Sequence, residues 1–251
     1  MSIQRPYRRT CRQFTNGSYA DSGKSRYIDH PLYARSPEHY VRAFFLLLKD
    51  VQELFDYVEP SDVNLPCFSY RIHELLLRIC VEIEANCKAI LSENGYTRSG
   101  DWKMTDYRKI EASHRLSRYL VKLPFWQGAN SMRTPFAAWA SRGSLPWYQA
   151  YNTTKHDRHN AFSQATFQHM TDAFAGLLAL LSSQFYTHDF SPGDVLLACE
   201  GPGDGMEAGI GGYLRVRFPD DWQAPDRYDF DWDSIKSDSD PFQQYDYTQV
   251  A

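Results

Sequence analysis

Apolar residues recur at helical spacing over several long stretches of the chain. The first stretch follows Ser36-Pro37-Glu38, which supplies an N-cap residue, a proline at the first helical position and an acidic first turn. Pro60 stops it. The pattern predicts a helix over about 37–58, with apolar positions Val41, Phe44, Phe45, Leu48, Val51, Leu54, Phe55 and Val58.

A second helix is predicted from about Phe68 to Ser92, because Asn94-Gly95 then provides a stop signal. Glu84 lies on this helix between Cys80 and Cys87, among apolar neighbours. An unpaired buried charge is costly, so we expect Glu84 either to have a partner or to be protonated. The main apolar stripe is Ile72, Leu75, Leu76, Ile79, Ile83 and Ile90.

A third helix is predicted over about 106–122, with Thr105 as its cap and Pro124 just beyond its end. An aromatic stretch with several prolines follows. Within it, Thr134-Pro135 predicts a short helix through Trp139.

The fourth long helix is predicted to start around Leu145-Pro146 and to continue through His159. The fifth is predicted over about 162–186, where Ala and Gly stand beside Phe and Leu. Small residues allow a neighbouring helix to approach closely. We therefore expect the fifth helix to be the central one.

Beyond Pro192 the pattern changes to two short strands, Val195–Glu200 and Tyr213–Phe218, joined by a glycine-rich loop. The loop lacks the Lys-Ser/Thr of a phosphate-binding P-loop, and a strand rather than a helix follows it, so a hairpin is predicted. The fold class is therefore mainly α, a bundle of about five helices with a small C-terminal β-hairpin. The predicted units are an irregular arm (1–35), the bundle (36–190), the β segment (191–225) and a tail (226–251).

Charged residues are distributed unevenly along the chain. The 251 residues are 43% hydrophobic, enough for a sizeable core, and their net charge of −4 gives no overall attraction to nucleic acid. The arm, however, is basic and the tail is acidic, with seven Asp against Arg227 and Lys236. Three interpretations follow: the two ends attract each other, one of them binds a partner, or both are solvated tails.

The five cysteines are Cys11, Cys67, Cys80, Cys87 and Cys199, with no Cys-x-x-Cys pair among them. This pattern favours neither a zinc site nor a disulfide framework, and we predict no metal and no cofactor. No signal peptide follows the basic start, and the longest apolar stretch, 173–181, is too short to span a bilayer. A reducing cytoplasm is the expected location.

The segment from Tyr148 to His159 is the richest in candidate chemistry. On one continuous helix, Tyr148, Asn152, His156 and His159 would share a face, with Lys155 and Arg158 flanking it. Histidine transfers protons near neutral pH, Lys and Arg bind phosphate, and an Asn amide orients a ribose or phosphate oxygen. The set suits a phosphodiester better than a metal. The alternative is an internal polar network in which Asn152 and His156 tie this helix to Glu84.

The segment Ala-Tyr-Asn-Thr-Thr-Lys-His-Asp-Arg-His, residues 150–159, resembles bacterial proteins that carry a Tyr-Asn-x-x-Lys-His-x-Arg signature. These in turn resemble the HEPN superfamily of helical bundles, many of which are metal-independent endoribonucleases with an Arg-Asn-x-x-x-His motif. Asn152 and His156 match the Asn and His of that motif, whereas Tyr151 stands at the Arg position. The resemblance implies a homodimer, since family sites are often shared between two protomers.

The leading hypothesis is an RNA-binding or RNA-cleaving protein of a bacterial toxin or phage-defence system. In it His156 is the general acid/base, Lys155 and Arg158 hold phosphate, and Asn152 orients the substrate. Glu84 supports the cations, and Tyr151 leaves the charge-stabilising role to Lys155 or Arg158. The basic arm has Arg5, Arg8 and Arg9 beside Tyr7, a pattern typical of segments that bind single-stranded RNA. The alternative is a non-catalytic scaffold, and a third possibility is a protein partner bound by the C-terminal segment.

Overall fold

A computed structural model describes residues 2–190 and 204–250 of the chain. It is mainly α-helical, as predicted, with three long helices side by side: α1 (Pro37–Phe55), α2 (Tyr70–Glu93) and α7 (Phe167–Phe185). The predicted first, second and fifth helices are thereby confirmed. Ser36 precedes α1 with a left-handed backbone and makes no capping bond through its side chain, so its predicted capping role is wrong.

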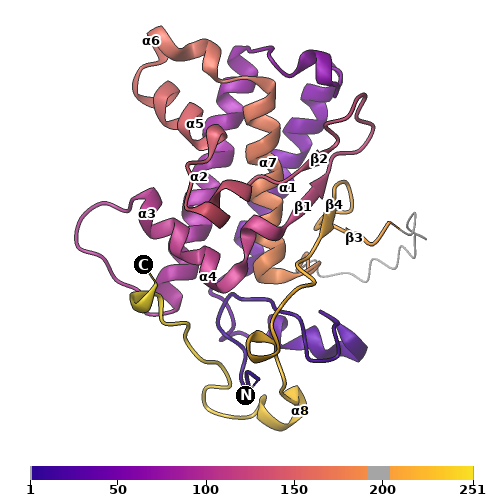
Figure 1. Cartoon of the computed structure of the whole chain (residues 1–251), viewed down its shortest axis with the longest axis vertical. Coiled ribbons are helices and arrows are strands. Elements are labelled where there is room, and N and C mark those ends of the chain that lie inside the picture. Colours follow the sequence, from indigo (N-terminus) through magenta and orange to yellow (C-terminus); the bar gives the residue numbers. More distant parts are fainter. Residues whose placement is uncertain (1, 191–203, 251) are drawn as a thin grey trace.

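Helix α7 is the central element of the bundle (Figure 1). Every residue from Ala173 to Phe185 is buried, and α7 packs against both α2 and α5 (Pro146–His156). Gly176 lies against Phe136 and Trp147, and a Cβ added there would be in ordinary van der Waals contact with both rings. The burial of α7 on all sides places it at the centre of the bundle, as the sequence predicts.

The predicted third helix, 106–122, is wrong over most of its length. The chain forms two single turns of helix, α3 (Met104–Tyr107) and α4 (Glu111–His114), with a 3-10 turn between them and another at Leu116–Arg118. Arg115 adopts a left-handed conformation (φ 52°) that ends α4. The Glu111 carboxylate accepts hydrogen bonds from the backbone N–H and hydroxyl of Ser117, which hold the turn closed.

The chain then becomes extended, because the next residues belong to a sheet rather than a helix. Four antiparallel strands lie in the order β2-β1-β4-β3, namely Met132–Arg133, Leu120–Lys122, Arg215–Arg217 and Glu207–Ala208. Val121 is buried opposite Val216. The predicted strand at 213–218 is confirmed as β4, whereas the predicted strand Val195–Glu200 lies outside the described residues. The predicted short helix after Thr134-Pro135 is a 3-10 turn, Ala137–Ser141.

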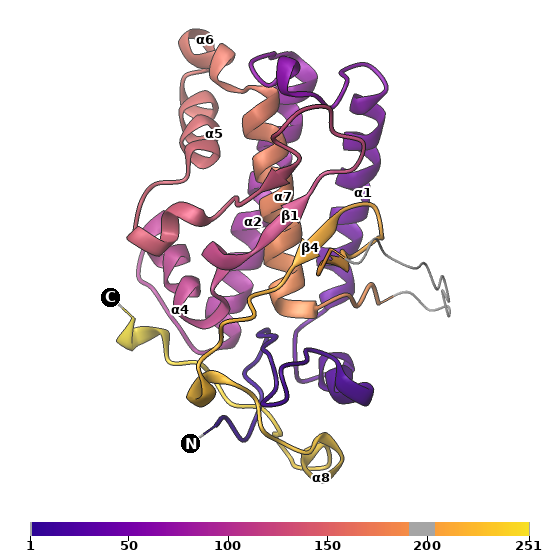
Figure 2. The ribbon, with the colours of Figure 1, turned by 45° about the vertical axis from the view of Figure 1, so that its right-hand side comes forward.

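The arm and much of the tail fold together beneath the bundle, and the end of the tail runs up beside α4 (Figure 2). Tyr228 of the tail is fully buried, and its hydroxyl donates a hydrogen bond to the carbonyl of Thr10 (2.7 Å). Arg5 pairs with Asp238 and Arg8 with Asp240, each at 2.6 Å. Attraction between the two ends is therefore the correct interpretation, and the view of both as solvated tails is wrong. The arm also contains a 3-10 segment, Asp21–Asp29, and the tail contains α8 (Trp232–Ile235).

The arm packs through its aromatic residues. Phe14, Tyr19 and Tyr27 are buried, and the Phe14 and Tyr27 rings both contact Tyr228 edge-on. Among the residues the structure describes, no helix is both long and apolar enough to cross a membrane.

Candidate functional site

The candidate site lies at the C-terminal end of α5, which stops three residues before the predicted end of this helix. Asp157 has a non-helical backbone (φ −135°, ψ 62°), and its carboxylate accepts a hydrogen bond from the N–H of Asn160 (3.3 Å). It thereby caps a new short helix, α6 (Arg158–Ala161). Tyr148, Asn152 and His156 therefore share one side of α5, but His159 does not continue that row, which corrects the prediction.

The polar side chains of this region face solvent. The buried side of α5 is formed by Trp147, Ala150, Tyr151 and Thr154, whereas Asn152, Lys155, His156, Arg158 and His159 are exposed. We call residues 155–159 the basic turn. Over the part of the chain that the structure describes, no ion pair joins Lys155 or Arg158 to a carboxylate. Asp157 lies between them in the sequence, but its two oxygens accept hydrogen bonds from Asn160 and it forms no ion pair with either cation in the described structure.

Glu84 has a partner, but not the predicted one. The hydroxyl of Tyr148 donates a hydrogen bond to Glu84 Oε1 (2.8 Å), so α2 and α5 are tied through Tyr148. Asn152 and His156 are exposed and do not form the predicted tie to Glu84. Burial, reinforced by this bond and by the nearby carboxylate charge, raises the pKa of Tyr148 well above its usual value.

Tyr151 holds Lys155 in place. Lys155 Nζ donates a hydrogen bond to the Tyr151 hydroxyl (3.1 Å) and lies 5.1 Å from the centre of the same ring. This hydrogen bond raises the pKa of Lys155, and the charge of Glu84 acts in the same direction. The rings of Tyr148 and Tyr151 contact each other, with their centres 5.3 Å apart. Glu84 therefore acts on Lys155 through its charge, and its hydrogen bond is to Tyr148.

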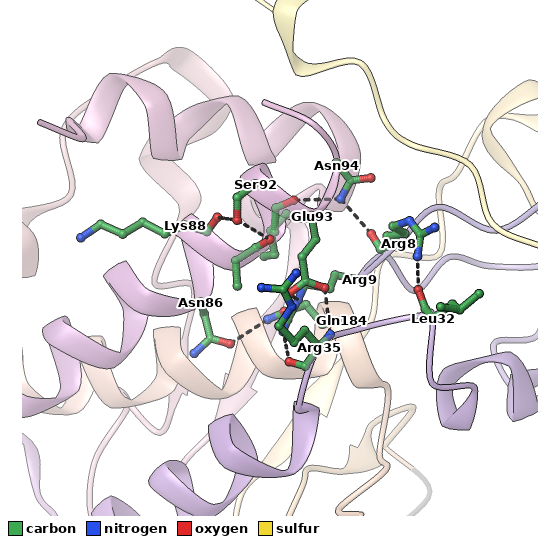
Figure 3. A network of polar contacts seen from close by, with 12 residues as sticks. Arg8, Arg9, Leu32, Arg35, Asn86, Lys88, Ser92, Glu93, Asn94 and Gln184 are labelled. Carbon is green, nitrogen blue, oxygen red and sulfur yellow. Dashed lines mark hydrogen bonds and ion pairs between the residues drawn. The ribbon is translucent and has the colours of Figure 1, made fainter. Parts of the chain in front are cut away.

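The arginines of the arm lie elsewhere and have partners within the chain (Figure 3). Arg9 is fully buried: its Nε lies 2.8 Å from a Glu93 carboxylate oxygen, and its Nη1 donates to Gln184 Oε1 (2.9 Å). Arg5 and Arg8 are neutralised by aspartates of the tail. Arg9 has no exposed surface, so it cannot contact an RNA strand outside the protein. The prediction that Arg9 binds RNA is therefore wrong.

An aromatic group that was not predicted from the sequence lies beside the basic turn. The Phe162 ring, just after α6, contacts the rings of Phe68, Tyr70 and His73. Burial lowers the pKa of His73, and the positive charge of Arg158 adds to this effect. Phe68 precedes α2, and Tyr70, the first residue of α2, lies off its apolar stripe. Two aromatic residues outside the stripe are the signal that could have revealed this group.

The residue types of the site do not suggest a metal centre. Among residues 2–190 and 204–250, no group of three or more His, Cys, Asp or Glu side chains is arranged to hold an ion. The site presents two cations, a histidine and an amide on an open surface. These groups can bind a phosphate-bearing ligand. In comparisons with family models, curated proteins and solved structures, no match to this chain was found.

Proposed function

We propose that the outer end of α5 and the basic turn bind RNA, and that this surface cleaves it without a metal ion in a HEPN-like protein of a toxin or phage-defence system. The observation that carries the proposal is that Lys155, Arg158 and His156 are exposed together, and that the two permanent cations lack carboxylate partners in the described structure. Several other arginines of this chain are paired with carboxylates, as Arg71 and Arg78 are with Asp50. Cations left free in one place favour a polyanion as ligand.

Each residue has a role in this proposal. His156 removes the proton of a ribose 2′-hydroxyl, whose oxygen then attacks the adjacent phosphorus. The bond to the 5′ oxygen breaks as that oxygen gains a proton, so the products are a 2′,3′-cyclic phosphate and a 5′-hydroxyl. Lys155 and Arg158 stabilise the charge on the phosphate oxygens, and Asn152 orients the ribose or phosphate.

The Tyr at the family's Arg position fits this distribution of roles. Tyr151 is buried and bears no charge of its own, but it holds the ammonium of Lys155 at 3.1 Å. The cation is thus supplied one turn further along α5, which supports Lys155 as the replacement for the missing Arg.

The test is a cleavage assay in EDTA with total RNA and a tRNA pool. We expect wild-type protein to leave 2′,3′-cyclic phosphate ends and His156→Ala to lose this activity. His39→Ala is the matched control, because His39 is an exposed histidine on α1 (77% exposed) outside the site. Because His156 is exposed, its removal should change the thermal midpoint by no more than about 2 °C. Equal cleavage by wild-type and His156→Ala protein would refute the proposed role of His156.

A scaffold function remains the second candidate, supported by one surface feature. Leu46 (54% exposed) and Val81 (52% exposed) form an apolar groove between α1 and α2 with Leu77. Arg78 and Glu82 border the same groove. A second copy related by a two-fold axis would place the same apolar surface of each chain against the other and cover both. The homodimer is therefore proposed to form through this face.

Light scattering during size-exclusion chromatography tests that arrangement. Wild-type protein should elute as a dimer and Leu46→Asp as a monomer, whereas Val63→Asp, at an exposed apolar position outside the groove, should remain dimeric. A wild-type monomer at all concentrations would rule the proposed dimer out. Dimerisation without RNA binding or cleavage would favour the scaffold function.

A further inference from the structure

Two exposed aromatic side chains, Phe68 and Tyr70, lie against the half-buried ring of Phe162, which directly follows α6. Figure 1 shows α6 at one end of the bundle. Tyr70 is 71% exposed and Phe68 is 50% exposed, and both flank Phe162. The ring centres of Tyr70 and Phe162 lie 4.7 Å apart, and those of Phe68 and Phe162 lie 5.6 Å apart. We call Phe68, Tyr70 and Phe162 the aromatic platform. Large rings left in water at such density commonly mark a binding site.

The backbone beneath the platform is fixed by hydrogen bonds. The Ser69 hydroxyl accepts a bond from the N–H of Ile72 and caps α2, so Tyr70 begins a helix of 24 residues. The loop before it is joined to the start of α7, where Phe167 N donates to the Cys67 carbonyl at 2.7 Å. Phe68 also forms a β-bridge with Thr166. The backbone that carries Phe68 and Tyr70 therefore needs little ordering when a ligand binds.

The platform borders the basic turn. Phe162 follows α6 directly, four residues after Arg158, and its ring lies 5.7 Å from the ring of buried His73. His73 in turn lies within the electrostatic reach of Arg158. Exposed rings and unpaired cations thus adjoin on one surface of the molecule.

We propose that the aromatic platform stacks the bases of single-stranded RNA while Lys155 and Arg158 hold its phosphates. The inference rests on the proposed function and narrows its substrate to unpaired RNA. Every base has a face that stacks on an aromatic ring, and in a duplex those faces are already covered by neighbouring base pairs. Tyr70, the most exposed of the three rings, is the main stacking residue.

The experiment measures binding by fluorescence anisotropy, using end-labelled 12-nucleotide oligo(A) and a 12-base-pair RNA duplex in EDTA. We use His156→Ala as the background, so that the label is not lost through cleavage. Onto it are placed Tyr70→Ala, Tyr70→Phe, Phe125→Ala and the double change Lys155→Gln with Arg158→Gln. Phe125 is the matched control, since it is an 82% exposed ring in the β1–β2 loop, outside the platform.

We expect oligo(A) to bind more tightly than the duplex. Tyr70→Ala should weaken oligo(A) binding about fivefold or more. Tyr70→Phe, which keeps the ring, should retain the affinity, and Phe125→Ala should leave it unchanged. The charge variant should weaken both ligands and reduce the salt dependence of binding.

The outcomes separate the two proposals. If the charge variant weakens binding but Tyr70→Ala does not, or if the duplex binds as well as the single strand, the platform has no stacking role and the proposed RNA-binding surface stands. If neither ligand binds, or if the charge variant binds as the background does, the proposed function fails together with the inference drawn from it.

Discussion

The ammonium of Lys155 donates a hydrogen bond to the hydroxyl of Tyr151, one turn earlier on α5, across 3.1 Å. Tyr151 is buried and Lys155 is exposed, so a fixed phenol orients a charge at the surface. A long Lys side chain otherwise samples many rotamers, and binding a ligand would cost the entropy of ordering it. The pair therefore offers a partly preorganised cation beside Asn152 and His156.

Tyr151→Phe should lower the pKa of Lys155 towards its ordinary value. The variant removes the hydrogen bond that contributes most to the raised pKa and keeps the ring and its packing. A pH titration of the lysine side-chain NMR signals measures the shift. Tyr148→Phe is the control, because that hydroxyl bonds to Glu84 and not to Lys155. An unchanged Lys155 pKa in Tyr151→Phe would show that the contact is not formed in solution.

Glu93→Ala should destabilise the protein by about 3 kcal/mol or more, since it leaves the Arg9 guanidinium buried without a counter-charge. Arg9 has no exposed surface, and its Nη2 donates to the Arg35 carbonyl at 2.8 Å. Asp238→Ala removes the partner of the more exposed Arg5 and should cost less than about 1 kcal/mol. Urea unfolding of the two variants measures the difference. If both variants lost the same free energy of unfolding, the Arg9–Glu93 pair would contribute no more to stability than a surface pair.

Gly128→Ala should disrupt the β1–β2 loop. Its backbone is left-handed (φ +121°), and an added Cβ would lie 2.3 Å from Cγ of Asp62. The Asp62 carboxylate accepts hydrogen bonds from Trp126 Nε1 (2.7 Å) and from the N–H of Ala129 (2.8 Å), so displacing it breaks both. We expect a thermal midpoint several degrees lower and a shifted indole N–H signal from Trp126.

Gly100→Ala is the control for that change, because Gly100 also has a left-handed backbone (φ +83°) but open space around its Cα. Gly100→Ala should therefore lose only the stability that the strain of a left-handed alanine costs. If the two variants lost the same stability and the Trp126 signal stayed in place, contact with Asp62 would not be the reason that residue 128 is a glycine.

The sequence predicts the long helices well, because each of them buries one stripe against the same core. The apolar spacing that locates α1, α2 and α7 is a direct consequence of that burial. The segment 106–122 has similar spacing, yet Leu120–Lys122 pairs with a strand nearly a hundred residues away. A local pattern carries no information about so distant a partner, and tertiary pairing overrides helical propensity there.

The same limit applies to the candidate site. Asn152 and His156 lie on one side of α5, as their spacing predicts. The break at Asp157 depends on a side chain bonding to Asn160, and an Asp in a helical pattern does not reveal that bond in advance. Burial of Arg9 depends on three separate segments of the chain, which supply Glu93, Gln184 and Arg35. A basic arm therefore has the same sequence pattern whether it folds inward or binds a partner.

His114 should make the protein unstable in acid. Its Nε2–H donates to the Arg9 carbonyl (2.8 Å), which can only accept, so Nδ1 carries the lone pair and accepts from the Ser113 hydroxyl (2.7 Å). Burial lowers the pKa of His114 to about 3, from 6.5 in the unfolded chain. Below pH 6.5 the unfolded chain thus binds the proton more readily. The stability from this residue is complete above that pH and falls by up to about 1.4 kcal/mol per pH unit, until the pH reaches the folded pKa.

Urea unfolding between pH 7.5 and pH 4 measures this dependence through the free energy of unfolding. His114→Gln removes the titrating group, and although less stable at pH 7.5 it should lose stability less steeply on acidification than the wild type. Other groups also titrate in this range, so the difference between the two slopes, rather than either slope alone, reports on His114. If the slopes for His114→Gln and wild type were parallel, His114 would bind a proton as easily in the folded protein as in the unfolded chain. That result would contradict the effect expected from its burial between Arg9 and Ser113.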